Sequence, residues 1–212
     1  MPFPDPCCSV TTAVRCSIDN RSQMQYNKVK IPIWWYPMKR CIIRLALVFL
    51  VLFLISLFFR FTAGGELWET LCITFAVTAY HFWMRLGVGQ LLDHTLQNNV
   101  DFTKPWFRPR RFEPFLYRTI RVKKWKNHMP TYDTAYFDIR THSITEIIKA
   151  GCQAEIVHEI IIVLSFLPVG LAFWFRPAGV FLATSFLSAL VDSLFVIMQR
   201  YNRPRLLKLV SR

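Results

Sequence analysis

LALVFLVLFLISLFF, residues 45–59, decides the fold of this chain, because a run this apolar is typical of a segment within the hydrocarbon core of a membrane. Its flanks extend it to residues 41–60, and Arg44 near the start can reach the membrane surface with its long side chain. Three further apolar stretches follow, at residues 67–84, 156–175 and 178–198. Each is about the length that a helix needs to cross a bilayer, so the sequence predicts an all-α membrane protein with four transmembrane helices.

The composition favours a membrane protein over a soluble one. Hydrophobic residues make up 53% of the 212 residues, and the formal net charge is +13. A nucleic-acid-binding protein can be this basic, but it does not carry apolar runs of this length. We therefore expect the lipid bilayer and its anionic headgroups as partners, and no nucleic acid.

Two short links divide the four spans into two antiparallel hairpins. The links are TAGGE around residues 63–66 and RPAG at residues 176–179, and both are typical of tight turns. Of the 26 Lys and Arg residues, only Arg60 and Arg176 lie at these turns. The positive-inside rule therefore predicts a multi-pass protein of the cell membrane, with both termini and the basic loop of residues 85–155 in the cytoplasm.

The first 37 residues differ from the rest of the chain. Residues 1–37 are polar and lack periodicity, so we interpret them as a disordered extension, or as one that does not belong to the native protein. Residues 38–212 are expected to form a single membrane domain. Its start, MKRCIIRLALVFLVLF, also fits a signal peptide, but the long apolar run and the poor cleavage sequence FTAGG favour a retained span.

Neither the cysteines nor the histidines form a recognisable metal or disulfide pattern. No C-x-x-C pair is present among the six cysteines, and no Cys and His residues fall at zinc-finger spacing. We expect reduced thiols, no metal ion and no cofactor.

The central loop interleaves aromatic and basic residues in FRPRRFEPFLYRTIRVKKWK, residues 107–126. Aromatic side chains beside Arg and Lys are typical of a segment in the headgroup layer, with the apolar groups toward the lipid and the cations on phosphates. Single-stranded nucleic acid also binds such patterns, but the spans on both sides favour the membrane surface. A third use, binding the phosphates of an anionic substrate, is compatible with a position at the membrane surface.

A helix is predicted to lead into the third span. Ser143 and Glu146 match the S-x-x-E capping box, so the helix is expected to begin at Ile144. Its first turns carry Glu146, Lys149 and Gln153 as a polar stripe, opposite an apolar one.

Ionisable residues continue the apolar stripe of this helix within GCQAEIVHEIII, residues 151–162. At about 100° per residue, Glu155, His158 and Glu159 share its phase and are expected to face the protein interior. Other ionisable side chains are expected at a similar depth, near the cytoplasmic ends of their spans: His81, Arg85 and Asp192. Charged groups are costly inside a membrane, so this cluster is a candidate functional site.

Two histidines are candidates for a general base. His158 is the first, because Glu155 or Glu159 one turn away can orient its ring and raise its basicity. Alternatively, these carboxylates pair with arginines and hold the two hairpins together: Arg200, Arg203 or Arg205. The second candidate is His128, whose His-x4-Asp spacing to Asp133 is similar to the motif with which glycerolipid acyltransferases deprotonate a hydroxyl.

Three motifs resemble one family, in the same order along the chain. LYRTIRVKKWK at residues 116–126, CQAEIVH at 152–158 and QRYNRPRL at 199–206 are similar to the glycosyl-4,4'-diaponeurosporenoate acyltransferases, small bacterial membrane enzymes of carotenoid-glycoside synthesis. The resemblance covers about residues 105–208. It implies transfer of a fatty acyl group to the primary hydroxyl of a glycosylated C30 carotenoid acid, the last step toward a staphyloxanthin-type pigment.

The resemblance also implies a set of site residues. Beside Glu155 and His158, they are Arg121, Lys123, Lys124, Trp125, Lys126, Gln199, Arg200, Tyr201, Asn202, Arg203, Pro204 and Arg205. Five cations are expected to hold the phosphates of an acyl-CoA or acyl-carrier donor, and they are Arg121, Lys123, Lys124, Arg203 and Arg205. Asp192 is expected at the same site, and Asn202 or an arginine would stabilise the oxyanion. No G-x-S-x-G motif is present, which favours direct transfer over an acyl-enzyme.

Two other classes of protein are compatible with the sequence. In a non-catalytic accessory subunit of a membrane complex, the charged cluster would be a packing network. In a small proton-coupled transporter, the Glu, His and Asp side chains would carry protons, although four spans are few and the polar groups lie in one leaflet.

Overall fold

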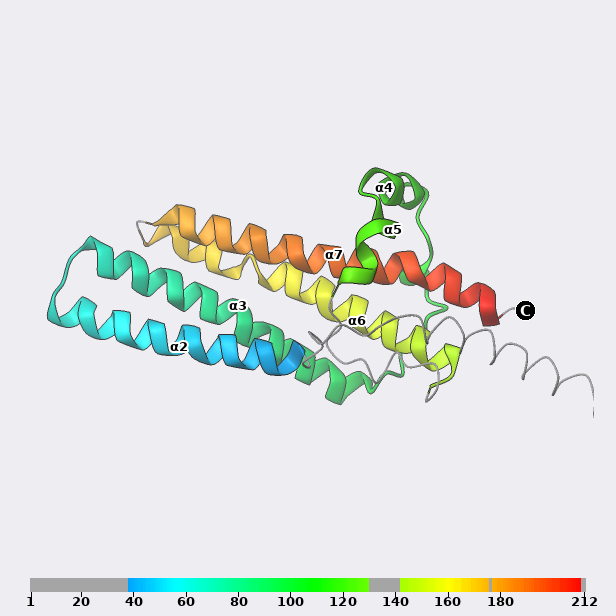
Figure 1. The fold of residues 1–212 in the computed structure, drawn as a ribbon, viewed down its shortest axis with the longest axis horizontal. Helices are drawn as coiled ribbons and strands as arrows, with labels where there is room; N and C mark the ends of the chain where they lie inside the picture. Colours follow the sequence, from blue (N-terminus) through cyan, green and yellow to red (C-terminus); the bar gives the residue numbers. More distant parts are fainter. Residues whose placement is uncertain (1–37, 130–141, 176, 211–212) are drawn as a thin grey trace, which may run out of the picture. The chain divides into compact units, whose positions relative to one another are not determined.

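The computed structural model describes residues 38–129, 142–175 and 177–210, and these residues fold into helices without any strand. Four helices are long and apolar enough to cross a membrane (Figure 1). They are α2 (Met38–Thr62), α3 (Glu66–Leu96), α6 (Ile144–Leu164), which the 3-10 helix η4 (Leu167–Phe173) continues, and α7 (Ala178–Val210). The prediction of a multi-pass, all-helical membrane protein is confirmed.

The two hairpins are α2 with α3, and α6 with α7. Gly64 (φ 66°) and Gly65 (φ 98°) make the turn of the first hairpin, in a left-handed backbone region that glycine enters without steric strain. Stacked aromatic rings hold the two helices of this hairpin together. Phe59 and Trp68 stack beside the turn with ring centroids 4.5 Å apart, and Phe49 stacks on Phe82 further along at 5.6 Å.

Apolar and polar side chains are distributed as lipid requires. On α2, large side chains such as Val48, Leu54 and Phe58 are 52–62% exposed. The buried residues of the helices include serines and ionisable groups instead: Ser56, His81, Glu155, Ser165, Ser185, Ser188 and Asp192. Because hydrocarbon cannot hydrogen-bond, a membrane protein keeps its polar groups inside and its apolar groups outside.

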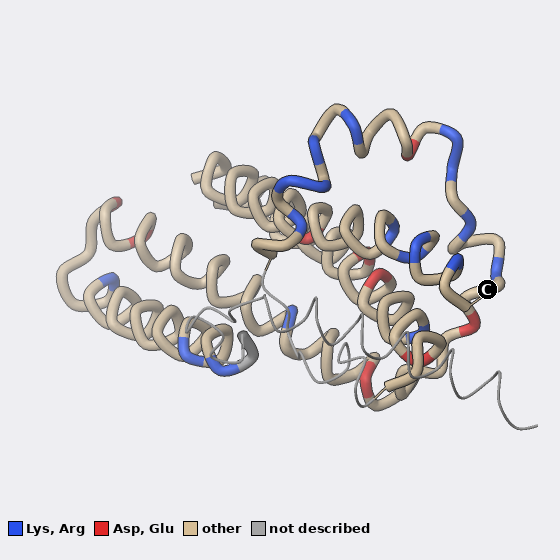
Figure 2. The backbone as a smooth tube through the Cα atoms, turned by 45° about the vertical axis from the view of Figure 1, so that its right-hand side comes forward, with Lys and Arg blue, Asp and Glu red and all other residues tan. Residues whose placement is uncertain are grey.

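Most of the Lys and Arg residues that the structure describes lie at one end of the bundle (Figure 2). We call this end, where α3 and α7 finish and α6 begins, the basic end. The described residues between α3 and α6 form the central segment, which contains four short helices: η1 (Pro105–Phe107), α4 (Glu113–Thr119), α5 (Val122–Trp125) and η2 (Lys126–His128). The opposite end, with the two hairpin turns, carries Arg60.

The capping box predicted for the start of α6 is present. The Ser143 Oγ accepts a hydrogen bond from the Glu146 N–H at 3.3 Å, and the Glu146 carboxylate accepts one from the Ser143 N–H at 2.7 Å. The helix begins at Ile144, as predicted.

The polar stripe predicted for α6 is wrong at Gln153, which is buried with only 6% of its surface exposed. Its Oε1 accepts a hydrogen bond at 2.7 Å from the N–H of Asn98, where α3 has just ended in left-handed residues. Gln153 therefore satisfies the end of a neighbouring helix and does not face water. Both α3 and α7 also continue beyond the apolar stretches that end at residues 84 and 198, because polar residues extend the same helices out of the apolar layer.

Candidate functional site

A histidine and an aspartate meet between α6 and α7. His158 Nδ1 lies 2.8 Å from Asp192 Oδ1, and the Asp192 side chain is only 2% exposed. The imidazole also stacks on Phe195, with a centroid distance of 4.6 Å and an interplanar angle of 5°. One ring nitrogen and one ring face are therefore held in place. Within the described residues, no hydrogen bond to Nε2 of His158 is present.

Arg85 of α3 completes this polar layer. Its Nη2 donates to Asp192 Oδ2 at 2.5 Å and to Ser188 Oγ at 2.8 Å. The Ser188 hydroxyl in turn lies 2.8 Å from the Ser165 hydroxyl, at the end of α6. We call these residues, with His158 and Asp192, the inner polar layer. It joins both hairpins, since α3 belongs to the first and α6 and α7 to the second.

The two glutamates predicted to orient His158 have other partners. Glu155, fully buried, accepts a hydrogen bond from Arg200 Nη1 at 2.8 Å and forms an ion pair with Arg203. Glu159 accepts a hydrogen bond from the Trp106 Nε1–H at 2.9 Å, and its other oxygen lies 3.8 Å from Arg200. The carboxylate that contacts the His158 ring is instead that of Asp192. The alternative in which these carboxylates pair with arginines is the arrangement found.

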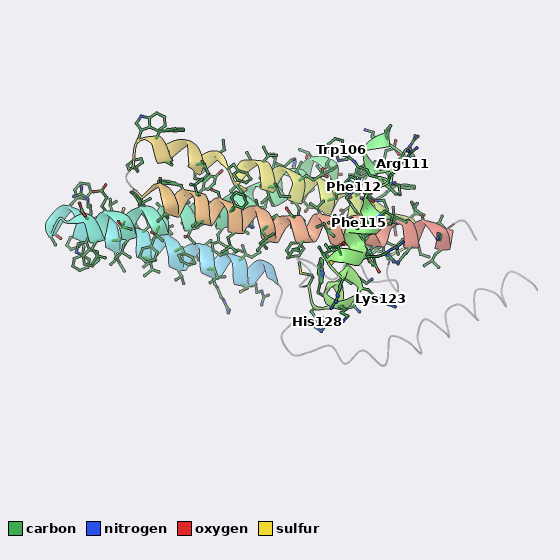
Figure 3. The ribbon with its side chains drawn as sticks, turned by 90° about the horizontal axis from the view of Figure 1, so that it is seen from above. Trp106, Arg111, Phe112, Phe115, Lys123 and His128 are labelled. Carbon is green, nitrogen blue, oxygen red and sulfur yellow. The ribbon has the colours of Figure 1, made fainter. Side chains whose placement is uncertain are left out.

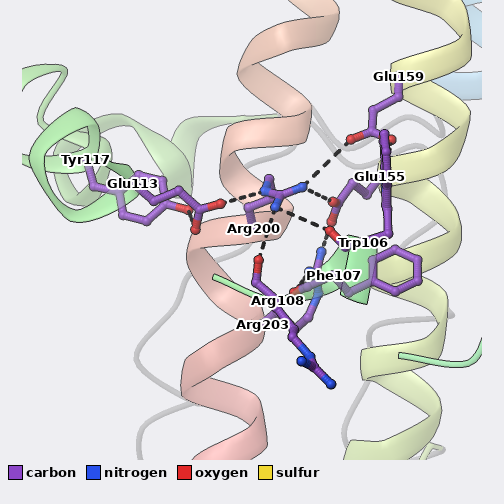
Figure 4. A network of polar contacts seen from close by, with 9 residues as sticks. All are labelled: Trp106, Phe107, Arg108, Glu113, Tyr117, Glu155, Glu159, Arg200 and Arg203. Carbon is purple, nitrogen blue, oxygen red and sulfur yellow. Dashed lines mark hydrogen bonds and ion pairs between the residues drawn. The ribbon is translucent and has the colours of Figure 1, made fainter. Parts of the chain in front are cut away.

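Arg200 is the centre of a second set of contacts, which we call the Arg200 network (Figure 4). Besides Glu155, its guanidinium donates to Glu113 Oε1 at 2.8 Å, and Glu113 is buried at the start of α4. Arg203 donates to the Phe107 carbonyl at 2.6 Å and lies over the Phe107 ring. The network therefore holds α6 and α7 together and fastens the central segment to them. It does not join the two hairpins, which is the task of Arg85 and Asp192.

Two members of this network were missed by sequence reasoning, Glu113 and Trp106. Glu113 had a signal, since it is the one acidic residue within the basic stretch 107–126. Tyr117 donates to Glu113 Oε2 at 3.0 Å. Burial, and then this hydrogen bond to a carboxylate, raises the pKa of Tyr117 above its ordinary value of 10.0.

The ring of His81 forms no hydrogen bond with the inner polar layer, although the sequence predicts His81 and Arg85 at the same depth. It is 5% exposed, and neither ring nitrogen has a hydrogen-bond partner among the described residues. Its carbonyl accepts a hydrogen bond from Arg85 Nη1 at 2.9 Å. His81 thus contributes to the layer through its backbone.

The predicted phosphate-binding cations divide into two groups. Arg121, Lys123 and Lys124 are exposed on and next to α5, and Arg205 is exposed with its guanidinium 3.5 Å from the centre of the Tyr201 ring. These four are available to an anion. Arg203 is buried against Glu155, and its charge is already neutralised.

Lys126 attaches the central segment to α7, whereas the hydrogen bond of Trp125 lies within the segment. Lys126 donates to Asn202 Oδ1 at 3.0 Å, and burial followed by the nearby Arg205 charge lowers the pKa of Lys126. The half-buried Trp125 donates from Nε1 to the Ile120 carbonyl at 2.9 Å.

Gln199 marks a close approach of α6 and α7. A Cβ added at Gly151 would lie 3.3 Å from the Gln199 Oε1, so glycine allows the two helices to pack closely here. The second candidate base, His128, is exposed at the end of η2, and its predicted partner Asp133 lies outside the described residues. Among the described residues, no group of three or more His, Cys, Asp and Glu side chains is arranged to hold a metal ion.

The fold and these contacts define a multi-pass helical membrane protein with a buried His–Asp pair and exposed cations toward its basic end. Residues 103–212 match the model of the family described as glycosyl-4,4'-diaponeurosporenoate acyltransferase. The chain belongs to this family and is an acyltransferase. The matched residues contain His158, Asp192 and the Arg200 network, whereas Arg85 lies outside them. Comparisons with curated proteins and with solved structures give no match.

Proposed function

We propose that this protein transfers a fatty acyl group from a thioester donor to a sugar hydroxyl of a glycosylated carotenoid, at the cytoplasmic surface of the cell membrane. The family supports acyl transfer and a glycosylated carotenoid acceptor. The four apolar helices support a membrane-embedded enzyme that meets such an acceptor in the bilayer. The observation that carries the proposal is the 2.8 Å contact between His158 and Asp192 inside the family-matched residues.

The proposed reaction uses His158 as the general base. Asp192 accepts the Nδ1–H hydrogen bond, which leaves the Nε2 lone pair to take the proton of the sugar hydroxyl. The hydroxyl oxygen attacks the thioester carbonyl carbon and forms a tetrahedral oxyanion. When this intermediate collapses, the carbon–sulfur bond breaks and the thiolate takes the proton back from the imidazolium. The products are an ester and a free thiol.

Arg85 is the cation best placed to stabilise the developing negative charge. It contacts the same carboxylate that holds His158, in the same buried layer. Asn202, the sequence-based candidate for this role, lies ten residues beyond Asp192 on α7, about 15 Å along a helix that rises 1.5 Å per residue. Buried charges act more strongly than exposed ones, so a guanidinium in this layer can lower the barrier appreciably.

The exposed cations near α5 suit the phosphates of the donor. Arg121, Lys123, Lys124 and Arg205 are each exposed, and acyl-CoA and acyl-carrier thioesters both carry phosphate groups. Their position agrees with a donor that approaches from the cytoplasm. The same topology follows from the positive-inside rule, which puts the basic end and its anionic lipid contacts on the cytoplasmic side.

Lipid mass spectrometry of cells with and without the protein tests this proposal. The cells must also make the glycosylated carotenoid. We expect an ester of that glycoside to be present only when the protein is expressed, and the mass to identify the acyl chain. An unchanged set of carotenoid glycosides in a membrane that contains the protein would contradict the proposal.

A further inference from the structure

The central segment presents aromatic side chains outward. Trp106, Phe112 and Phe115 are 55%, 57% and 75% exposed, although α4 is a short helix at the polar end of the protein. Exposed cations lie among them: Arg110, Arg111 and Arg118. We call these six residues the α4 face. A surface that combines large aromatic groups with cations is typical of contact with membrane headgroups, because the rings bury apolar area while the cations meet phosphate.

Helix α4 adds no exposed acidic side chain to the α4 face, so nothing on this helix repels an anionic surface. Glu113, the acidic residue of α4, is 4% exposed and neutralised by Arg200. Trp106 is also fixed in position, since its Nε1 donates to Glu159 while most of the ring stays exposed. The outward charge of the face is therefore positive.

The attachment of the segment places it at headgroup depth. It is fastened to α7 through Arg200, Asn202 and Arg203, which lie two to five residues beyond the predicted apolar stretch that ends at residue 198. At 1.5 Å per residue, this is about 3–8 Å beyond the hydrocarbon core. The headgroup region occupies roughly 5–7 Å on each side of that core.

The direction of the segment agrees with this depth. Figure 1 shows α4 and α5 to one side of α7, level with its C-terminal part. Seen from above, the central segment crosses α7, with Trp106 and Phe112 toward one side and Lys123 and His128 toward the other (Figure 3). A segment that crosses a transmembrane helix runs along the membrane plane, so its outward side chains meet the lipids that surround the bundle.

We propose that the α4 face docks on the headgroup layer of an anionic bilayer and sets the position of the Arg200 network relative to the membrane surface. Charge complementarity and continuity with the lipid-facing helices favour lipid over a soluble partner. This docking specifies how the protein contacts the membrane, and it rests on the placement in the cell membrane given under the proposed function. It does not depend on the acyl-transfer chemistry.

Spin labels on the full chain test the docking. With the native cysteines replaced by serine, a nitroxide is attached at Phe115→Cys in vesicles that contain phosphatidylglycerol. Matched labels are attached at Phe58→Cys, on the lipid-facing side of α2, and at Lys123→Cys on α5. We expect the ratio of collisions with oxygen to collisions with a water-soluble nickel chelate to be several-fold higher at position 115 than at position 123. At position 58 the ratio should be high, which shows that the protein is inserted.

Each other outcome overturns the proposal. A label at position 115 as accessible to nickel as the one at 123 means that the face lies in water. A label shielded from both reagents means that protein covers the face, as in a dimer. Substitution of Arg110, Arg111 and Arg118 by Gln should lower the ratio at 115 in anionic vesicles and leave it unchanged in zwitterionic ones. An equal ratio for the parent chain in both vesicles excludes a role for lipid charge.

A second measurement keeps the native cysteines. A benzophenone amino acid at position 112 should crosslink to phospholipid under ultraviolet light, and a crosslink to protein alone would contradict the docking. Neither readout involves acyl transfer, so failure here and failure of the proposed reaction are separate results.

Discussion

Nδ1 of His158 lies 2.8 Å from Oδ1 of Asp192, a contact that joins α6 to α7 across 34 residues of sequence. The other oxygen of Asp192 is held by Arg85 of α3. One carboxylate therefore orients an imidazole and connects the two hairpins. Its removal should affect catalysis through the histidine and stability through the arginine.

Asp192→Asn tests the orienting role of the carboxylate. Asparagine keeps the size of the side chain but loses the charge that fixes the Nδ1–H tautomer and stabilises the imidazolium. We expect kcat of the reconstituted enzyme to fall about 10²–10⁴-fold, the range for loss of general base catalysis, with KM for the donor little changed. Asp192→Glu should restore part of kcat. If Asp192→Asn keeps full kcat, His158 does not act through this carboxylate.

Glu155→Ala tests the Arg200 network as a stabilising element. Its removal leaves the half-buried Arg200 and the buried Arg203 without Glu155, and breaking a buried ion pair destabilises by about 3–5 kcal/mol. The matched control is Glu69→Ala, which breaks the Arg60–Glu69 pair, whose side chains are 43% and 39% exposed. Exposed pairs contribute about 0–1 kcal/mol. Thermal unfolding in detergent should show a much larger loss for Glu155→Ala, and equal losses would contradict a structural role.

The raised pKa of Tyr117 predicts that the stability of the folded protein changes at alkaline pH. Its pKa is raised in the folded protein by burial and by the hydrogen bond to Glu113, from an ordinary value of 10.0. The unfolded chain therefore loses this proton first, and the contribution to stability is intact below pH 10.0 and falls as the pH rises above it. Tyr117→Phe should show a shallower loss of unfolding temperature between about pH 9 and about pH 11. Parallel curves for the two proteins would rule out this linkage.

Replacement of Lys123 and Lys124 tests the proposed binding site of the acyl donor. Replacing both by Gln removes two exposed charges on α5, so KM for an acyl-CoA donor should rise several-fold while kcat changes little. Added salt should raise KM of the parent enzyme more than that of the variant, because salt screens exposed charges. Lys104→Gln, an exposed cation outside the proposed site, serves as the control. A loss in kcat without a change in KM would place these lysines elsewhere in the mechanism.

The long helices could be predicted because their signals are local. Apolar runs of membrane length, a glycine pair at the first turn and the Ser143–Glu146 capping box each act within a few residues of sequence. The short helices of the central segment had no such signal. Among them, α4 has seven residues and is held by the contact between Glu113 and Arg200, which lie 87 residues apart in the sequence. Short helices depend on tertiary contacts of this kind.

The sequence was enough to predict which residues form the site, but not which carboxylate pairs with which partner. Helical phase identified Glu155 and His158 as inward-facing, and depth brought Asp192 and Arg85 to the same level. Phase alone could not show which carboxylate meets the imidazole, because that depends on how α6 and α7 are rotated against each other. Two nearby arginines on α7 bind Glu155, and Asp192 is left for His158. Gln153 was placed wrongly for a similar reason, since its partner is the end of α3.

The most direct test of the central claim is acyl transfer by His158→Ala compared with His128→Ala. Both proteins are expressed at equal levels in cells that make the glycosylated carotenoid, and the ester is measured by lipid mass spectrometry. If His158 is the general base, the ester is lost with His158→Ala and retained with His128→Ala. Retained ester with His158→Ala, together with loss in His128→Ala, would exclude His158 as the base and assign that role to His128, at the exposed end of η2.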